Sequence, residues 1–358
     1  MRDVYERLRE RLDELSVGYP ATRSGVEIDI LKKCFTEEEA GLFIRMGMRL
    51  ETPDQIAKRA GLDVTRVAHM LHGMAEKGLV FRKKRRDGPR YGAMAFAVGW
   101  YELQLGRMDR EFAELVERYW EEKLHRNFAM AGSLLRPVPV NRSVDARLAV
   151  APYEDCRKMV ESQKFLAVAE CICRKQQRLL GTGCDKPLEV CLVFGSHGQA
   201  YVDLGLARTI DVTEALEILD RAEKAGLVPQ PGNLENTTAI CNCCGDCCGV
   251  LRSLNRLDKP AQAVLSNFFM AVDPDLCTGC AECVDRCQMG AVTVSEDEVA
   301  SVNLDRCIGC GLCVTTCPTE ACRLVEKPED MRRTPPKDGV QMYAAVARQR
   351  GIPLEKLL

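Results

Sequence analysis

The stretch Cys277-Thr-Gly-Cys-Ala-Glu-Cys-Val-Asp-Arg-Cys287 recurs in outline as Cys307-Ile-Gly-Cys-Gly-Leu-Cys-Val-Thr-Thr-Cys317. Both runs have the spacing C-x2-C-x2-C-x3-C. Thiolates are soft ligands that suit iron-sulfur clusters, and in this spacing the fourth cysteine of each run ligates the cluster of the other run. The sequence therefore predicts two 4Fe-4S clusters and single-electron chemistry. The predicted ligands are Cys277, Cys280, Cys283 and Cys317 for the first cluster, and Cys307, Cys310, Cys313 and Cys287 for the second.

The residues around these runs carry a family resemblance. Between the runs, Val292–Val294 and Val299–Val302 flank a polar turn, which indicates a β-hairpin. From Ala271 to Glu326 the segment resembles the two-cluster bacterial-type ferredoxins, which implies their fold and low-potential electron transfer in the region of roughly −400 mV. Gln288 stands where the first motif often carries proline, and we expect it to loosen the turn after Cys287 without loss of a ligand. The alternative of two zinc sites fits less well, because zinc ligands are usually paired with a long spacer.

Composition sets the context for these motifs. The chain has 358 residues, of which 46% are hydrophobic, so it can form two or three domains, and its formal charge of -2 favours neither nucleic acid nor an anionic membrane. The N-terminal sequence has no apolar signal region, and the weakly polar run 91–101 is too short to span a bilayer. We therefore expect a cytoplasmic protein with no membrane contact. Its 20 cysteines are then better explained as metal ligands than as disulfides. A protein with so many iron-sulfur clusters points to an anaerobe.

The first hundred residues are predicted to form helices followed by a basic hairpin. Thr36 and Thr52 open two helices as capping residues, and Asp63 opens a third that ends at Gly78. Two short strands then flank the basic turn 83–89. This order resembles the winged helix-turn-helix domains of bacterial and archaeal regulators.

That resemblance implies DNA binding, with the third helix in the major groove and the basic turn on phosphates. The third helix, however, offers only Arg66, His69 and His72 as polar readers of base edges. A docking or dimerisation module is therefore the favoured interpretation, with DNA binding kept as an alternative.

Nine further cysteines gather in the middle of the chain. They are Cys171, Cys173, Cys184, Cys191, Cys241, Cys243, Cys244, Cys247 and Cys248. In extended chain, residues two apart point to the same side, so Cys241 with Cys243, and Cys171 with Cys173, are each expected to present a pair of thiolates. Adjacent residues point apart, so the doublets at 243–244 and 247–248 suggest two clusters or one larger cluster. Their grouping stays open.

We expect one or two additional iron-sulfur clusters here, with structural zinc or a dithiol relay as alternatives. The segment resembles parts of poorly characterised multi-cluster proteins of anaerobes, which implies no particular activity. Arg174, Lys175 and Arg178 follow Cys173 closely and can stabilise a reduced cluster. His197 is a weaker candidate ligand.

The whole chain is predicted to be a multidomain α+β protein. Its expected parts are a winged helix-turn-helix domain at 1–100, an amphipathic helix and linker at 101–145, a Cys-rich α/β domain at 146–260, a two-cluster ferredoxin domain at 261–327, and a tail at 328–358 with a short helix that wraps the ferredoxin domain or a partner.

The function predicted from these features is electron transfer between the ferredoxin clusters and the middle clusters, and on to a partner protein, a larger oxidoreductase. A homodimer is a further option. Two alternatives remain: a redox-sensing DNA-binding regulator, and a reductase with a catalytic, site-differentiated middle cluster. The chain has neither a G-x-G-x-x-G fingerprint after a strand nor a P-loop, so hydride transfer and ATP-driven reduction gain no support. No catalytic residue can be named.

Overall fold

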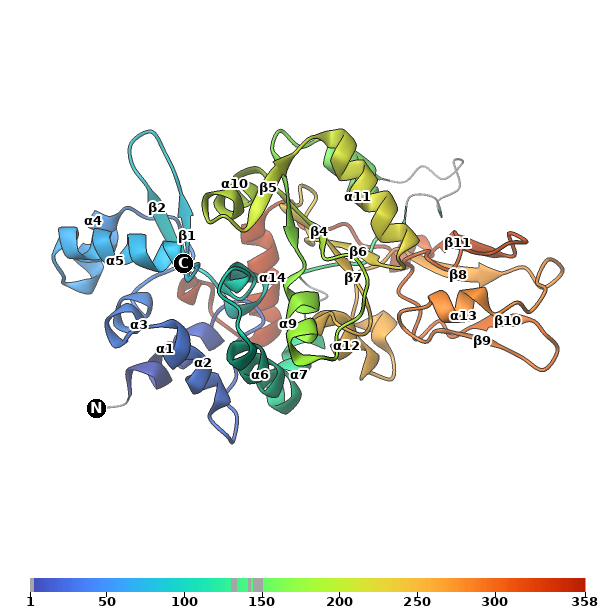
Figure 1. Ribbon diagram of the computed structural model, residues 1–358, viewed down its shortest axis with the longest axis horizontal. Helices are drawn as coiled ribbons and strands as arrows, with labels where there is room; N and C mark the ends of the chain where they lie inside the picture. Colours follow the sequence, from blue (N-terminus) through green and yellow to red (C-terminus); the bar gives the residue numbers. More distant parts are fainter. Residues whose placement is uncertain (1–2, 130–133, 141–142, 144–150, 358) are drawn as a thin grey trace.

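The computed structural model describes residues 3–129, 134–140, 143 and 151–357. Figure 1 shows an elongated molecule with a helical N-terminal part at one end, a five-stranded sheet in the middle and the ferredoxin-like segment at the other end. The chain is thus a mixed helix and sheet protein of several domains. The boundary predicted at 145–146 lies outside the described residues. No helix in the described ranges is both long enough and apolar enough to cross a membrane.

The N-terminal part contains the three predicted helices and the predicted hairpin, preceded by two further helices. The elements are α1 Val4–Asp13, α2 Val26–Cys34, α3 Glu37–Phe43, α4 Pro53–Ala60, α5 Val64–Glu76, β1 Val80–Lys83 and β2 Arg90–Ala93. Thr36 and Thr52 each form a full capping box with the residue three positions on, and Gly61 ends α4 with φ 68°. Local capping chemistry therefore explains these boundaries.

A long amphipathic helix follows, within the predicted helix and linker at 101–145. It consists of α6 Arg110–Tyr119, a wider turn Trp120–Leu124 and α7 His125–Phe128. The Trp120 ring lies under the guanidinium groups of Arg252 and Arg256, 3.8 and 4.3 Å from its centroid, and its Nε1 donates to Gly249 O at 3.2 Å. The apolar face thus packs against the middle of the same chain, on helix α12 Gly249–Asn255.

The middle sheet has the strand order β5-β3-β4-β7-β6, and each neighbouring pair is antiparallel. Its strands are β3 Leu166–Glu170, β4 Glu189–Phe194, β5 Ala207–Ile210, β6 Val228–Pro231 and β7 Ala239–Cys243. The prediction of an α/β domain was wrong in this respect, because that class has parallel neighbours. Only the connection through α9 Ile172–Leu180 returns the chain in the opposite direction, between the neighbours β3 and β4. The connections through α10 Gly195–Asp203 and α11 Val212–Lys224 are crossovers, because β4, β5 and β6 run in the same direction but are not neighbours in the sheet.

Two apolar layers cover the two faces of this sheet. Leu166 and Val168 of β3 pack with α8 Cys156–Glu161 and α11 Val212–Lys224. The alternate residues Ala167 and Ala169 face the other layer, which contains α9 Ile172–Leu180, α10 Gly195–Asp203 and the N-terminal helices. The period of two thus assigns alternate residues of each strand to opposite layers.

The ferredoxin-like segment consists of β8 Phe268–Val272, α13 Glu282–Arg286, β9 Val292–Val294, β10 Ala300–Val302 and β11 Cys322–Glu326. The expected hairpin is present, with Val292 opposite Val302. Gly309 has φ 66°, and a Cβ there would lie 2.2 Å from Phe268 O. Only glycine lets the second cysteine loop approach β8 so closely.

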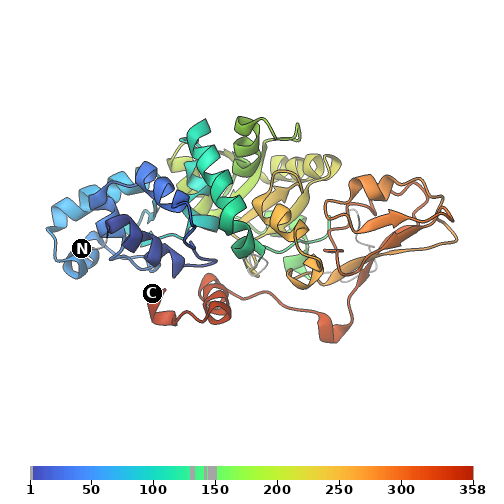
Figure 2. The ribbon, with the colours of Figure 1, turned by 90° about the horizontal axis from the view of Figure 1, so that it is seen from below.

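The C-terminal tail runs back along the molecule to the N-terminal part (Figure 2). The short helix predicted in the tail is α14 Gly339–Arg350. Arg350 Nη1 donates to Asp13 O at 2.7 Å and to Ser16 O at 3.0 Å, and Met48 N donates to Leu357 O at 2.9 Å. We expected the tail to wrap the ferredoxin domain or a partner, but it closes on the first helices of its own chain.

Candidate metal and iron-sulfur sites

The structure divides the nine middle cysteines into two groups on opposite faces of the sheet. Cys241 and Cys243 of β7, like Cys191 of β4, point away from the layer that holds α11, whereas Cys244 lies within that layer. The first group comprises Cys171, Cys173, Cys191, Cys241, Cys243 and Cys248 and is called the six-thiol pocket. The second comprises Cys184, Cys244 and Cys247 with Asp246 and is called the three-thiol site. Strand β7 thus turns Cys243 away from Cys244, and the turn before α12 separates Cys247 from Cys248. The sequence alone leaves this grouping open.

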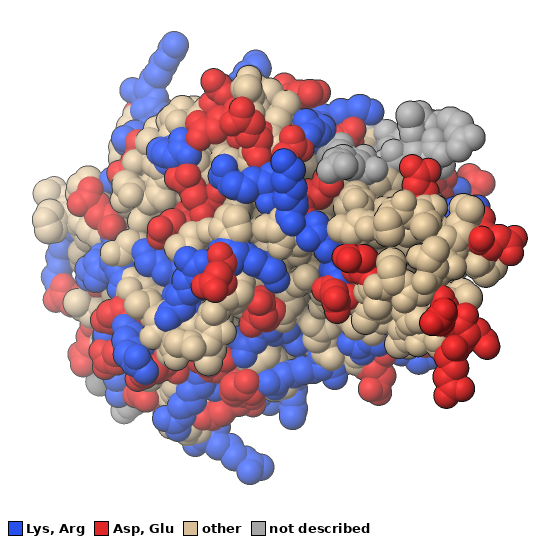
Figure 3. All heavy atoms as spheres, turned by 45° about the vertical axis from the view of Figure 1, so that its right-hand side comes forward, with Lys and Arg blue, Asp and Glu red and all other residues tan. Residues whose placement is uncertain are grey.

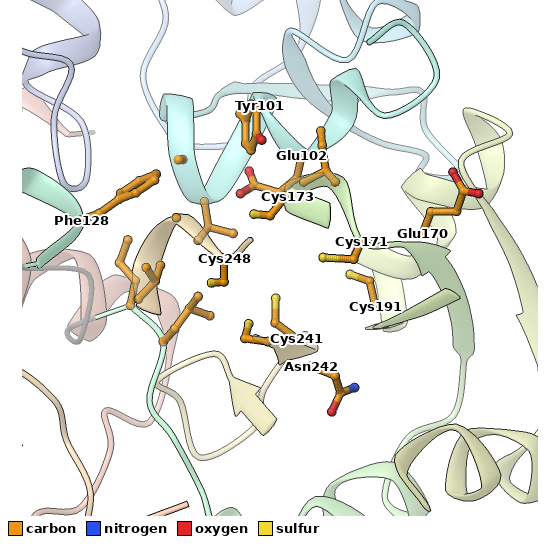
Figure 4. Close-up of a pocket in the computed structure, with 18 of the residues that line it drawn as sticks. Tyr101, Glu102, Phe128, Glu170, Cys171, Cys173, Cys191, Cys241, Asn242 and Cys248 are labelled. Carbon is orange, nitrogen blue, oxygen red and sulfur yellow. The ribbon is translucent and has the colours of Figure 1, made fainter. Parts of the chain in front are cut away.

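The six-thiol pocket is an apolar hollow with about 830 Å³ of empty space, including open solvent at its mouth. Figure 4 shows its labelled cysteines around a common space, with Tyr101, Glu102 and Phe128 on one side. The thiols form a connected series. Each is within hydrogen-bonding reach of the next, in the order Cys171, Cys173, Cys248, Cys243, Cys241 and Cys191.

Different local structures bring these thiols together. Cys191 and Cys241 are opposite one another because Leu192 pairs with Ile240 in the antiparallel register. Cys248 is the N-cap of α12, while Cys171 is the N-cap of α9 and Cys173 lies in its first turn. The predicted pairing of Cys171 with Cys173 is therefore present, but a helix start brings it about instead of extended chain.

The thiols of the pocket can ionise together only if positive charge compensates them. Two effects raise the pKa of Cys171, Cys241 and Cys243 well above the usual thiol value. Hydrogen bonding to a neighbouring thiol is the larger effect, and burial is the smaller. Six thiolates would not coexist there without compensating positive charge. Iron supplies such charge, since a coordinating thiol is deprotonated by its metal. The residues present therefore fit an iron-sulfur cluster.

Glu102 adds a titratable carboxyl to the wall of this pocket. Burial raises the pKa of Glu102 to about 7, and a hydrogen bond from the backbone N–H of Gly99, 2.6 Å from Oε2, only partly opposes that effect. The neighbouring Tyr101 hydroxyl donates to Gln176 Oε1 at 2.5 Å. A group that titrates near neutral pH thus faces the six thiols.

The three-thiol site lies on the other face of the sheet. Its sulfur atoms are close: 3.6 Å separates Cys247 Sγ from Cys184 Sγ, and 3.8 Å separates Cys184 Sγ from Cys244 Sγ. A hydrogen bond from Cys247 and the nearby Arg174 lower the pKa of Cys244 to about 6.

Arg174 is fully buried between the two groups of thiols. Its Nη2 donates to Cys244 Sγ and to Asn242 O, both at 3.3 Å, and its Nη1 donates to Pro187 O. Lys175 instead pairs with Glu170 near the surface, and Arg178 donates to the carbonyl groups of Cys184 and Lys186. Of the three basic residues singled out in the sequence, Arg174 is thus the one that contacts a thiol directly.

The eight ferredoxin-like cysteines also form two groups. The four predicted for the first cluster line one pocket, which encloses about 310 Å³ and which Cys322 also lines. Cys287, Cys307, Cys310 and Cys313 lie close enough to interact electrostatically. Backbone N–H groups point at sulfur: Ala300 N to Cys277 Sγ at 3.3 Å, Ala291 N to Cys287 Sγ at 3.3 Å, and Met270 N to Cys307 Sγ at 3.4 Å. Such donors stabilise thiolate charge.

Gln288 connects the two cysteine-rich segments. Its Oε1 accepts a hydrogen bond from Gly245 N at 2.8 Å, and its backbone oxygen accepts one from Asn255 Nδ2 at 3.0 Å. The turn after Cys287 is therefore held in place. Gly245 lies between Cys244 and Cys247, so this contact joins the end of the first ferredoxin cysteine run to the cysteine loop of the middle sheet.

Other candidate residues lie elsewhere. His197 stacks on Phe81, with ring centroids 6.1 Å apart, and burial lowers its pKa to about 4. His72 contacts Arg82 and Glu76. Cys156, which we did not predict as a ligand, is buried in the layer under α11. Sequence reasoning missed Glu102, Asp246 and the role of Gln288, although Asp246 stands between two cysteine doublets and was a visible signal.

Comparison with known proteins identifies one part of the chain. Residues 270–324 match the family model of a 4Fe-4S dicluster domain. Neither a curated protein nor a solved structure matches the chain. The chain therefore carries a 4Fe-4S dicluster domain near its C-terminal end, and this domain together with the cysteine-rich middle segment indicates iron-sulfur electron transfer.

Proposed function

We propose that this protein transfers electrons between the dicluster domain and an iron-sulfur cluster in the six-thiol pocket. One observation carries the proposal: a single apolar core contains cysteines of both sites. Cys243 and Cys248 of the pocket pack there with Ile308 and Leu312, and Cys241, Cys287, Cys307 and Cys310 lie against the same core. The path of an electron from the second cluster to the pocket would thus run through packed protein and not through water.

The proposed ligands in the dicluster domain are those predicted from the spacing. When bound, each 4Fe-4S cluster accepts or releases one electron. The cysteines hold the iron, and the N–H groups of Ala300, Ala291 and Met270 stabilise the negative charge on sulfur. In the middle domain, six thiols exceed the four that a cubane uses. This number favours one cluster larger than a cubane.

We place the docking surface for the redox partner at the first cluster. Cys280 is exposed there, and Leu276 beside it is 49% exposed. Acidic side chains surround this end of the molecule: Asp275, Glu282, Asp285, Glu296, Asp297 and Glu298 are all exposed. A partner oxidoreductase with a basic rim would be steered to this surface, so the rate of electron entry should fall as salt is added.

The contacts of the N-terminal hairpin support a packing and docking role for that part. Lys84 at the basic turn pairs with Asp203 of α10 at 2.8 Å, and Arg66 of α5 pairs with Glu38 at 2.8 Å. Figure 3 shows Lys and Arg interspersed with Asp and Glu over the face that it draws. Fluorescence anisotropy with duplex DNA at several salt concentrations tests the rival regulator. Salt-dependent binding that weakens on loss of Arg85 and Arg86 would support the regulator.

A reductase is the second candidate, and Glu102 favours it. A carboxyl that titrates near pH 7 can deliver a proton to a substrate reduced in the six-thiol pocket. The spectrum of the middle cluster in the presence of cyanide or carbon monoxide distinguishes the two cases, since an exogenous ligand binds only to iron with an open position. A shifted signal would favour the reductase over the relay.

The deciding experiment is the iron and acid-labile sulfide content of anaerobically purified protein, with EPR of the reduced form. We expect twelve or more irons per chain and signals beyond those of the dicluster pair. Cys248→Ser should remove only the additional iron and signals. Cys156→Ser is the matched control, because Cys156 is a buried cysteine of the same domain outside both groups. About eight irons in the wild type would refute the relay.

A further inference from the structure

The distances within the three-thiol site limit what it can bind. The ligand atoms of Cys184, Cys244, Asp246 and Cys247 all lie within 4.8 Å of one another. Two sulfur pairs are 3.6 and 3.8 Å apart. In the part of the chain that the structure describes, no other set of His, Cys, Asp or Glu side chains gathers in this way.

These separations match a single tetrahedral ion. Two sulfurs, each about 2.3 Å from one zinc ion and at the tetrahedral angle, are about 3.8 Å apart. The sulfurs at the corners of a cubane are held apart by the whole cluster and cannot come this close. The dicluster cysteines provide the contrast within the same molecule, since no three of them have their sulfur atoms all within 4.8 Å of one another in the described part of the chain.

The surrounding charges balance such an ion. Three thiolates and one carboxylate around a divalent cation carry a net charge of −2. Arg174 donates to Cys244 Sγ at 3.3 Å, and Lys186 Nζ lies 3.8 Å from Asp246 Oδ2. These two cations neutralise the assembly. Four protein ligands also leave no open position, which is the arrangement of structural zinc.

We propose that the three-thiol site binds one Zn²⁺ ion through Cys184, Cys244, Cys247 and Asp246. The ion fastens the loop around Cys184 to the turn that holds Gly245. Because Gly245 donates to Gln288, zinc would hold the junction between the middle sheet and the dicluster domain. Only this last role rests on the proposed electron transfer. The metal assignment stands on the geometry of the site.

The test measures zinc and iron separately on the full-length, anaerobically purified protein, with X-ray absorption at the zinc edge. We expect one zinc per chain, with three sulfurs near 2.3 Å and one oxygen at about 2.0–2.2 Å. Cys184→Ser and Cys247→Ser should lower zinc at least tenfold while iron and the EPR signals of the dicluster domain stay unchanged. Cys156→Ser should retain zinc.

Asp246 allows a test that does not depend on losing the metal. Its side chain is 44% exposed, so substitution there leaves the core intact. Asp246→Cys should keep zinc and change the ligand shell to four sulfurs, whereas Asp246→Ala should lose zinc to a chelator about tenfold faster than the wild type.

Three results would overturn the zinc assignment. They are absence of zinc from the wild type, loss of iron instead of zinc in Cys184→Ser and Cys247→Ser, and an unchanged zinc shell in Asp246→Cys. An iron count of eight with one zinc present would refute the six-thiol cluster alone. The two proposals therefore fail separately.

Discussion

The side chain of Gln288 and the backbone of Gly245 form a hydrogen bond of 2.8 Å that joins the dicluster domain to the middle sheet. A Cβ at position 245 would lie 2.6 Å from Gln288 O, so the approach also requires glycine. The residue at which the sequence departs from the ferredoxin pattern is thus the residue that makes this contact. Cys287 immediately precedes it, which puts the junction beside the second cluster.

Replacing Gln288 should weaken this junction without removing iron. Gln288→Pro restores the residue that the motif often carries but deletes the acceptor for Gly245. We expect an unchanged iron content, a loss of about 0.5–1.5 kcal/mol in the free energy of unfolding and slower reduction of the middle cluster in stopped-flow measurements.

Gln262→Ala is the control, because Gln262 is exposed in the same region. An unchanged reduction rate in Gln288→Pro would show that the contact has no part in positioning the two sites.

Glu102 should make the potential of the middle cluster depend on pH. Its carboxyl is neutral below about pH 7 and negative above it. A negative neighbour disfavours an added electron, so the midpoint potential should fall as pH rises through 7, by at most about 59 mV per pH unit. Glu102→Gln stays neutral and should flatten this dependence in potentiometric titrations.

The control for Glu102 is Glu170→Gln. Glu170 also lines the pocket, but it is exposed and paired with Lys175. If the pH dependence of the midpoint potential persisted in Glu102→Gln and disappeared in Glu170→Gln, the titrating group would be Glu170 and the prediction for Glu102 would be wrong.

Arg174 should be required for stability of the middle domain. Arg174→Met removes a buried guanidinium and leaves the carbonyl of Asn242 and the sulfur of Cys244 without their donor. Each buried acceptor left unpaired costs about 1–3 kcal/mol. Thermal unfolding should therefore show a clear loss of stability.

Lys175→Ala removes a more exposed cation of the same helix and should change stability by less than about 1 kcal/mol. If the two substitutions lowered stability equally, the buried hydrogen bonds of Arg174 would contribute nothing to the stability of the middle domain.

The tail should detach when Arg350 is removed. Its guanidinium donates to Asp13 O, Ser16 O and Asp13 Oδ1, the last at 3.2 Å. Hydrogen bonds of a charged donor contribute about 1.5–3 kcal/mol each at most. We expect Arg350→Ala to lower the melting temperature and to make residues 327–357 sensitive to limited proteolysis.

Arg348→Ala is the matched control, because Arg348 is exposed on the same helix and its side chain donates only to Ala344 O among the hydrogen bonds described. Proteolysis at equal rates in the two variants would contradict a role for Arg350 in holding the tail.

Local chemistry explains what the sequence alone predicted. The spacing of Cys277 to Cys317 indicated the dicluster domain, which the family match confirms. Capping residues such as Thr36 and Thr52, and the glycine after α4, marked helix boundaries in the N-terminal part. These signals are short-ranged, because a cap or a ligand spacing depends on residues only a few positions apart.

The tertiary structure alone decided how the middle cysteines divide, where the tail docks and what Gln288 contacts. Cys184 meets Cys244 across 60 residues of chain, and Arg350 meets Asp13 across 337. Such long-range contacts depend on strand order, register and the face of the sheet to which each residue points. Here the antiparallel order placed Cys191 beside Cys241 and left Cys244 on the opposite face. The sequence determined which residues are of the types that can bind metal; the packing of the sheet determined which of them lie together.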